Sequence, residues 1–280
     1  MKKWAISAIV YLLVVVGAYT AYSTFTGSKE LNHSNSDLEH QASTEHVNSG
    51  EEHGHGDEHS DHNENSSEDS QVLTLLHEEN GELIITLKDE QGNPVTNLEV
   101  NHEKLMHLIV VSSDLEQYYH LHPEADEPGV FKVAHTLSDG EYKVFVDIKP
   151  KDLNYKVQPI SFILGSPGEV HEHHRLQKDE VMVKEINTHR VTLEPSTLKA
   201  NEDVQLKFDL NGETPEQHLG ALGHVVILDE TANQYIHVHP LDGNEPIFET
   251  KFTKPGTYKI WAEFKFNSDV FVFPYVVEIN

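Results

Sequence analysis

The sequence MHLIVVSSDLEQYYHLHP at residues 106–123 aligns without a gap with GHVVILDETANQYIHVHP at residues 223–240. In each copy a β-branched apolar run precedes a polar stretch and a second short run that ends in proline. This pattern predicts two antiparallel strands joined by a turn. A second match, GEYKVFVD at residues 140–147 with GTYKIWAE at residues 256–263, follows each copy. The chain therefore contains two internal repeats.

Short apolar runs separated by turn residues continue through both repeats, and no stretch shows a helical period. The expected strands cover residues 72–77, 82–88, 105–112, 117–122, 130–136, 141–147 and 158–164, and then 191–193, 204–210, 224–229, 234–239, 247–252, 256–263 and 270–279. Short strands at this spacing favour an antiparallel two-sheet sandwich. We expect an all-β fold with two tandem immunoglobulin-like β-sandwiches, at residues 71–165 and 181–280, joined by a polar linker at residues 166–180.

The N-terminal part has a different composition. Residues 4–22 form a nearly continuous apolar run after Lys2 and Lys3, which predicts a transmembrane signal anchor over residues 1–23 with the lysines in the cytoplasm. Residues 24–70 are rich in Ser, Asn, acids and His, which predicts a disordered linker. The expected location is the cell membrane, with a single pass and the bulk of the chain extracytoplasmic.

The two repeats share a three-point histidine spacing. His107 precedes His120 and His122 by 13 and 15 residues, and His224 precedes His237 and His239 by the same intervals. In a hairpin, residues opposite each other, or two apart on one strand, share a face of the sheet. A turn centred between Ser113 and Asp114, or between Asp114 and Leu115, puts one histidine trio on one face; an odd-length loop separates it.

Histidines gathered in this way predict a metal site in each repeat. The ligands would be His107, His120 and His122 in the first repeat and His224, His237 and His239 in the second. Imidazole nitrogens bind such metals at about 2.0–2.1 Å, which three neighbouring side chains can reach together. The alternative is that each His-x-His-Pro is a structural corner whose imidazoles bond loop carbonyls.

The surroundings of the trios can also be predicted. Tyr119 and Leu121 alternate with the histidines, so their face should meet the core and the histidine face should be the more open one. Pro123 and Pro240 lack a ladder donor and should end their strands at a sheet rim. Asp147 and Glu263 end a matched strand, and are candidates for a fourth ligand or for solvated strand ends.

Composition narrows the chemistry. The chain has 280 residues with 47 acids, 20 Lys or Arg, 21 His and no Cys, and a net charge of −27. This charge repels phosphate backbones, so no nucleic-acid partner is expected. The lack of Cys excludes metal or catalytic sites that use a thiolate. With Met scarce as well, an imidazole set favours Cu(II), Zn(II) or Ni(II) over Cu(I), and the usual affinity order makes Cu(II) the tightest of the three. We expect about two divalent ions bound by the fragment of residues 71–280. His-rich runs at residues 24–70, and His171, His173 and His174, could bind metals loosely.

The strings M-H-L-I-V-V-S-x-D-L…H-x-H-P and L-G-A-L-G-H…H-V-H-P resemble those of bacterial envelope proteins with one or two YtkA-like domains, over residues 83–279. The resemblance implies immunoglobulin-like sandwiches related in style to FixH-like and CopC-like proteins, a membrane segment, and handling of copper or another metal. CopC-like sites commonly use the mature N-terminal amine, which this chain does not obviously present.

No catalytic motif is evident, so we expect a protein that is not an enzyme. The predicted function is extracytoplasmic binding, buffering or delivery of Cu(II) or Zn(II). The alternative is a membrane-anchored immunoglobulin-like module for adhesion, or for assembly of a respiratory or transport complex with an envelope protein partner, in which the histidines are structural.

Overall fold

The structure, a computed structural model, describes residues 70–166, 175–236 and 238–280, all within one compact unit that spans Asn63–Asn280. The predicted anchor at residues 1–23, the predicted linker at residues 24–70 apart from Ser70, and most of the connector at residues 166–180 lie outside the described residues. Among the residues that are described, no helix has the length and apolar character needed to cross a bilayer.

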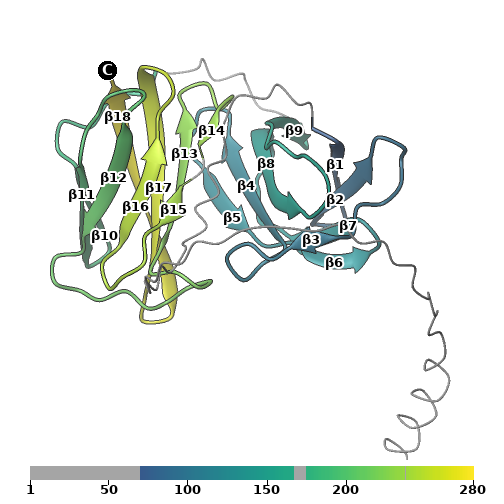
Figure 1. Ribbon diagram of the computed structural model, residues 1–280, viewed down its shortest axis with the longest axis horizontal. Helices are drawn as coiled ribbons and strands as arrows, with labels where there is room; N and C mark the ends of the chain where they lie inside the picture. The colour runs from purple at the N-terminus through teal and green to yellow at the C-terminus, as the bar shows by residue number, and fades with distance from the viewer. Residues whose placement is uncertain (1–69, 167–174, 237) are drawn as a thin grey trace, which may run out of the picture. The chain divides into compact units, whose positions relative to one another are not determined.

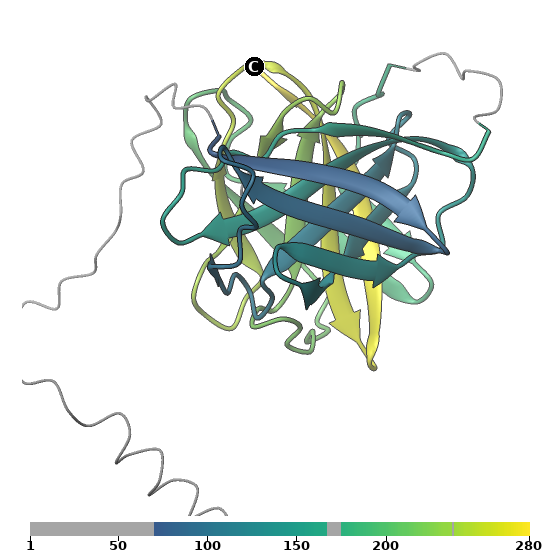
Figure 2. The same cartoon turned by 90° about the vertical axis from the view of Figure 1, so that its right-hand side faces the viewer.

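The first repeat forms two antiparallel sheets. One has the order β1-β2-β7-β6, and β1 and β2 lie side by side in blue in Figure 2. The other has the order β3-β8-β4-β5, with β9 also paired to β8. The strands are β1 (Val72–Glu79), β2 (Glu82–Asp89), β3 (Leu98–Glu99), β4 (Met106–Ser112), β5 (Tyr118–Leu121), β6 (Glu124–Glu127), β7 (Val130–Ala134), β8 (Gly140–Pro150) and β9 (Ile160–Leu164).

The second repeat also forms two antiparallel sheets, with β10 as an additional strand at the edge of one of them (Figure 1). Its sheets have the orders β10-β11-β12-β16-β15 and β14-β13-β17-β18. The strands are β10 (Val183–Ile186), β11 (His189–Pro195), β12 (Asp203–Asp209), β13 (His224–Asp229), β14 (Tyr235–Ile236), β15 (His239–Pro240), β16 (Ile247–Lys251), β17 (Gly256–Phe266) and β18 (Asp269–Ile279). The expected all-β fold with tandem immunoglobulin-like sandwiches is confirmed.

Each sandwich encloses its own apolar core. In the first, alternate residues of the strands point inward, among them Leu83, Ile85, Leu108 and Val146. In the second, a larger core includes Phe208, Phe248, Phe264 and Tyr275. Burial of these side chains is what holds two sheets face to face, because it removes apolar surface from water.

The His-x-His-Pro segments lie where the chain changes sheets. In the first repeat β5 ends at Leu121 and β6 begins at Glu124 in the opposite sheet. In the second repeat β14 pairs with β13, whereas His239 and Pro240 pair with β16 in the opposite sheet. The prediction of a single strand over residues 234–239 is therefore wrong. Strands β3, β6 and β10 were not expected from the sequence; β3 has only two residues, and β6 is fully exposed and has no apolar alternation.

A third apolar cluster joins the two sandwiches. It combines side chains at matched positions: Ile109, Val111, Leu115 and Phe145 from the first repeat with Val226, Leu228, Ala232 and Trp261 from the second. These residues lie on β4, β8, β13, β17 and the hairpin turns, on faces that point away from the two sandwich cores. The sandwiches therefore pack against each other through the strands that carry the histidine motif.

Candidate metal centre

The structure brings His107, His120 and His122 together. His107 lies on β4, His120 on β5, and His122 directly after β5. Their ring centroids are 5.1 Å apart for His107 and His120, 5.0 Å for His107 and His122, and 4.6 Å for His120 and His122. Each ring offers a nitrogen, and these three atoms lie within 4.8 Å of one another.

The hairpin register explains this convergence. Leu108 pairs with Leu121 and Val111 with Tyr118, so the turn is centred between Asp114 and Leu115, one of the two positions that the spacing allowed. The turn is fixed locally: Leu115 adopts a positive φ of 61°, and Asp114 Oδ1 accepts a 2.5 Å hydrogen bond from Ser112 Oγ. The observed pairing therefore puts His107, His120 and His122 on one face of the hairpin, as the spacing allowed.

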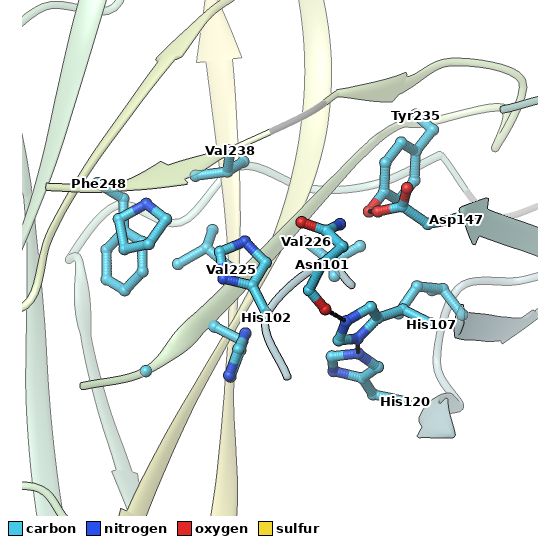
Figure 3. A pocket seen from close by; sticks show the side chains of 14 residues that line it. Asn101, His102, His107, His120, Asp147, Val225, Val226, Tyr235, Val238 and Phe248 are labelled. Atoms are coloured by element: carbon cyan, nitrogen blue, oxygen red, sulfur yellow. Dashed lines mark hydrogen bonds between the residues drawn. The ribbon is translucent and has the colours of Figure 1, made fainter. Parts of the chain in front are cut away.

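Hydrogen bonds fix where the protons of two of these rings lie. His107 Nε2 is 2.8 Å from the carbonyl oxygen of Asn101, and a carbonyl only accepts, so Nε2 carries the proton and Nδ1 carries the lone pair. His120 Nδ1 is 3.0 Å from Glu263 Oε2 and 3.2 Å from Oε1, so a neutral His120 has its lone pair on Nε2. Figure 3 shows His107 between Asn101 and His120.

The two lone pairs face each other. His107 Nδ1 and His120 Nε2 are 2.9 Å apart, and neither atom of this pair has a proton when both rings are neutral. Such a contact repels unless a cation lies between the nitrogens. Two kinds of cation can relieve this repulsion. One is a proton on His120, which then makes an ion pair with Glu263, and the other is a metal ion bound by both rings.

The third histidine supplies a free nitrogen. His122 Nε2 is buried and has no hydrogen-bond partner in the described part of the chain. Burial lowers the pKa of His122 to about 3 and that of His107 to about 4, in both cases mainly by desolvation. Both rings are therefore neutral near pH 7, the form in which imidazole binds metals.

Glu263 is an ionised carboxylate in this setting. Burial alone would raise the pKa of Glu263, but contacts with His120 and Tyr118 outweigh it and hold this pKa at about 2. Tyr118 Oη donates to Glu263 Oε1 at 2.6 Å. A carboxylate that accepts from the outer nitrogen of a ligand histidine is a common feature of metal sites. Glu263 was expected as a fourth ligand or a solvated strand end. It instead accepts a hydrogen bond from His120 Nδ1, the ring nitrogen that does not face His107.

The expectation that the histidine face is the open face is wrong. Tyr119 and Leu121 do pack on the first core, but Ile109 and Val111, on the same face as His107, pack against the second sandwich. The reason is visible in β4, every residue of which is buried. A continuous apolar run indicates a strand that is covered on both faces, and the sequence LIVV at residues 108–111 is such a run.

The contacts between the sandwiches come in equivalent pairs. Tyr118 of the first repeat bonds Glu263 of the second, and Tyr235 of the second bonds Asp147 of the first at 3.2 Å. Tyr118 stacks on Trp261 with ring centroids 5.0 Å apart, and Tyr235 lies 5.7 Å from Phe145. The interface is thus of the isologous kind, in which each repeat contributes the same patch.

The second trio is only partly described. His224 has the same outer contact as His107: its Nε2 lies 2.9 Å from the carbonyl oxygen of His218, six residues upstream, as His107 Nε2 bonds Asn101. Burial likewise lowers the pKa of His224 to about 4. His237 and the side chain of His239 lie outside the described part of the structure, as do the histidines of residues 24–70 and His171, His173 and His174. The second site remains a prediction.

One histidine of the site, His102, was not expected from the sequence. A cavity of about 40 Å³ between the sandwiches is lined by residues that include His102, His107, His120, His224 and Asp147. The ring of His102 is 5.6 Å from that of His224 and 6.2 Å from that of His107. Figure 3 shows Asp147 beside Tyr235 at this cavity. The outer contacts of His107 and His224 each use the carbonyl oxygen of the residue six positions upstream, and no residue type in the sequence signals such a backbone contact.

Fold and geometry define the class of this protein: a tandem of immunoglobulin-like β-sandwiches that places a histidine cluster at the contact between its repeats. The sequence matches the model of one family, described as "Domain of unknown function (DUF8832)", over residues 67–164 and again over residues 184–280. The chain belongs to this family and carries its domain twice. No curated protein matches the sequence.

The chain also has weak similarity to solved structures. A two-domain fibronectin type-III segment of chicken tenascin has 11% identity and a TM-score of 0.24, covering 75% of this chain and 99% of that one. The adhesin InvE of Yersinia pseudotuberculosis has 12% identity and a TM-score of 0.21, with coverages of 75% and 60%. The Escherichia coli adhesin FdeC has 13% identity and a TM-score of 0.22, with coverages of 75% and 64%. At these values the similarity says nothing about ligands or partners.

Proposed function

We propose that His107, His120 and His122 bind one divalent transition-metal ion. The observation that carries this proposal is the 2.9 Å approach of His107 Nδ1 to His120 Nε2, since the outer hydrogen bonds of both rings leave lone pairs on these two atoms. The unpartnered, buried Nε2 of His122 supports it, because an ion would satisfy an atom that otherwise costs roughly 1–3 kcal/mol.

The geometry favours Cu(II) over Zn(II). Two nitrogens 2.9 Å apart subtend about 90° at an ion that lies about 2.0–2.1 Å from each. This angle fits the tetragonal geometry of Cu(II), whereas tetrahedral Zn(II) needs the nitrogens to separate to roughly 3.3 Å. Met106 packs inside the first core and Met182 against the second, so neither supplies the thioether that Cu(I) prefers.

The proposed role is buffering or delivery of the ion outside the cytoplasm. It is supported by the apolar run at residues 4–22, which we propose as a membrane anchor, and by the resemblance to YtkA-like envelope proteins. The net charge of −27 attracts cations to the chain, and seven histidines at residues 24–70 provide further weak ligands.

The test is titration of the full chain with Cu(II) and Zn(II). All variants are made in a background chain in which each of the seven histidines between residues 24 and 70 is replaced by asparagine. Loose binding at those histidines then does not obscure ion binding by the folded part. We expect saturable Cu(II) uptake that falls by about one ion per chain in His107→Ala, His120→Ala and His122→Ala. His77→Ala is the matched control, since His77 is exposed on β1, away from the trio.

Two results would reject the proposal. One is the absence of saturable uptake of either ion by the background chain. The other is uptake that is unchanged when the trio is replaced. The histidines would then be structural, and the chain would be an adhesion or assembly module that contacts an envelope protein.

A further inference from the structure

We propose that the second sandwich completes the metal site of the first, with Glu263 as the positioning residue that keeps His120 Nε2 directed at the ion. Ion binding and packing of the two repeats are then coupled. This inference rests on the proposed function and goes beyond it. It requires the second sandwich to be packed against the first for full ion binding, whereas a site built from one hairpin alone would not.

The contact that carries the inference crosses the interface between the repeats. Glu263 lies on β17 of the second sandwich, and its two carboxylate oxygens are 3.0 Å and 3.2 Å from His120 Nδ1 on β5 of the first. The side chains of His120 and Glu263 are 8% and 5% exposed, so water is largely excluded from this pair. In the described residues, these two oxygens are the hydrogen-bond partners of His120 Nδ1.

The position of the proton on His120 therefore depends on Glu263. A carboxylate can only accept, so it selects the form with the proton on Nδ1 and the lone pair on Nε2, which faces His107. An amide in the same place can offer its NH₂ group to Nδ1 and thereby select the opposite form. Loss of such an outer contact typically weakens metal binding by about 10–100-fold.

Glu263 is itself held by both repeats. Tyr118 of the first sandwich donates to Glu263 Oε1 at 2.6 Å and stacks on Trp261, two residues before Glu263 on β17. The carboxylate thus reaches His120 only while the aromatic contact between the repeats is formed. Because coupling between two equilibria is reciprocal, an ion that binds better to the packed state also favours that state.

The chain offers a matched control for Glu263. Glu213 Oε2 lies 2.8 Å from Nδ1 of His189, another buried histidine, and this pair belongs to the second sandwich alone. His189 packs on Phe266 and Phe271 rather than on the trio. Glu213→Gln therefore repeats the same chemical change on a histidine–carboxylate pair that does not support the proposed site.

The experiment uses the full chain with asparagine at the seven histidines of residues 24–70. Cu(II) affinity is measured by competition with a chelator, and the coordination by electron paramagnetic resonance. We expect Glu263→Gln to weaken binding by about 10–100-fold and to change the copper hyperfine splitting. Glu263→Asp should recover part of the affinity, and Glu213→Gln should change neither readout.

Hydrogen exchange tests the coupling itself. With Cu(II) bound, backbone amides of β13 and β17 in the second sandwich should exchange more slowly in the parent chain, and this protection should be lost in Glu263→Gln. If Glu263→Gln does not fold, as judged by circular dichroism, Glu263→Asp and Tyr118→Phe take its place, and both should bind Cu(II) more weakly than the parent.

The failures of the two proposals are distinguishable. If the parent chain takes up no Cu(II), the proposed function fails. If the parent binds Cu(II) and folded Glu263 variants bind it with the same affinity and spectrum, the function stands and the inference about Glu263 is overturned. Protection confined to β4 and β5 would overturn the coupling between the repeats.

Discussion

Tyr235 Oη of the second sandwich lies 3.2 Å from Asp147 Oδ2 of the first, and Tyr118 and Glu263 make the equivalent contact in the opposite direction. The two pairs differ in their surroundings. Glu263 also accepts from His120, whereas burial raises the pKa of Asp147. Duplication has thus produced an interface in which the same positions carry unequal electrostatic roles.

This inequality predicts unequal costs for removing the two hydroxyl groups. Tyr118→Phe removes a short bond to an ionised, buried carboxylate, so we expect it to lower the free energy of unfolding by about 1.5–3 kcal/mol. Tyr235→Phe removes a longer bond and should cost about 0.5–1.5 kcal/mol. Urea unfolding of metal-free protein measures both. Equal losses, or a larger loss for Tyr235→Phe, would show that the shorter bond to Glu263 is not the stronger of the two contacts.

The two hairpin turns provide a second comparison. Leu115 and Ala232 occupy matched positions, with φ of 61° and 49°, a region that glycine adopts without strain. Both are buried at the interface, but the side chains differ in size. Leu115→Gly should therefore cost about 2–4 kcal/mol of unfolding free energy through the lost packing.

Ala232→Gly should be nearly neutral, because relief of about 1–2 kcal/mol of backbone strain offsets the loss of one buried methyl group, about 0.8 kcal/mol. Chemical denaturation of the two variants side by side checks this contrast. A cost above about 2 kcal/mol for Ala232→Gly would mean that the turn is not strained by a side chain at this position.

The fold was largely predictable because its signals are local. Alternation and turn residues located the sandwich strands, and the repeat of residues 106–123 at 223–240 showed the duplication. Strands β3, β6 and β10 were missed because pairing with neighbours, not an apolar pattern of their own, defines them. The placement of β14 in one sheet and of β15 in the other also depends on contacts distant in sequence.

The site was predictable only within one hairpin. The 13- and 15-residue intervals place His107, His120 and His122 together because strand pairing alone determines which side chains share a face. The role of Glu263 depends on how two sandwiches pack, which no spacing encodes. The apolar run at residues 108–111 did contain the information that the histidine face is covered, since both of its faces are apolar.

The position of Met106 gives a prediction about the ion. Met106 adjoins His107 in sequence but points to the opposite face, into the first core, where it is fully buried. Met106→Leu conserves volume, so we expect a stability change below about 1.5 kcal/mol. Affinities for Cu(II) and for Cu(I) should both be unchanged in competition assays. Selective loss of Cu(I) binding would place the thioether among the ligands, against the observed packing.

Removal of the ion should destabilise the protein by an amount that depends on concentration. An ion that binds only the folded state adds about 2.7 kcal/mol to the unfolding free energy when its free concentration is 100 times the dissociation constant. Thermal unfolding with increasing Cu(II) should therefore show a midpoint that rises steadily, and a chelator should reverse the rise. In His122→Ala the rise of the midpoint with Cu(II) should be much smaller, because one ligand nitrogen is missing. The metal-free midpoint of this variant should change little, since His122 Nε2 forms no hydrogen bond in the described residues. A midpoint that is independent of Cu(II) in the parent chain would contradict binding to the folded state.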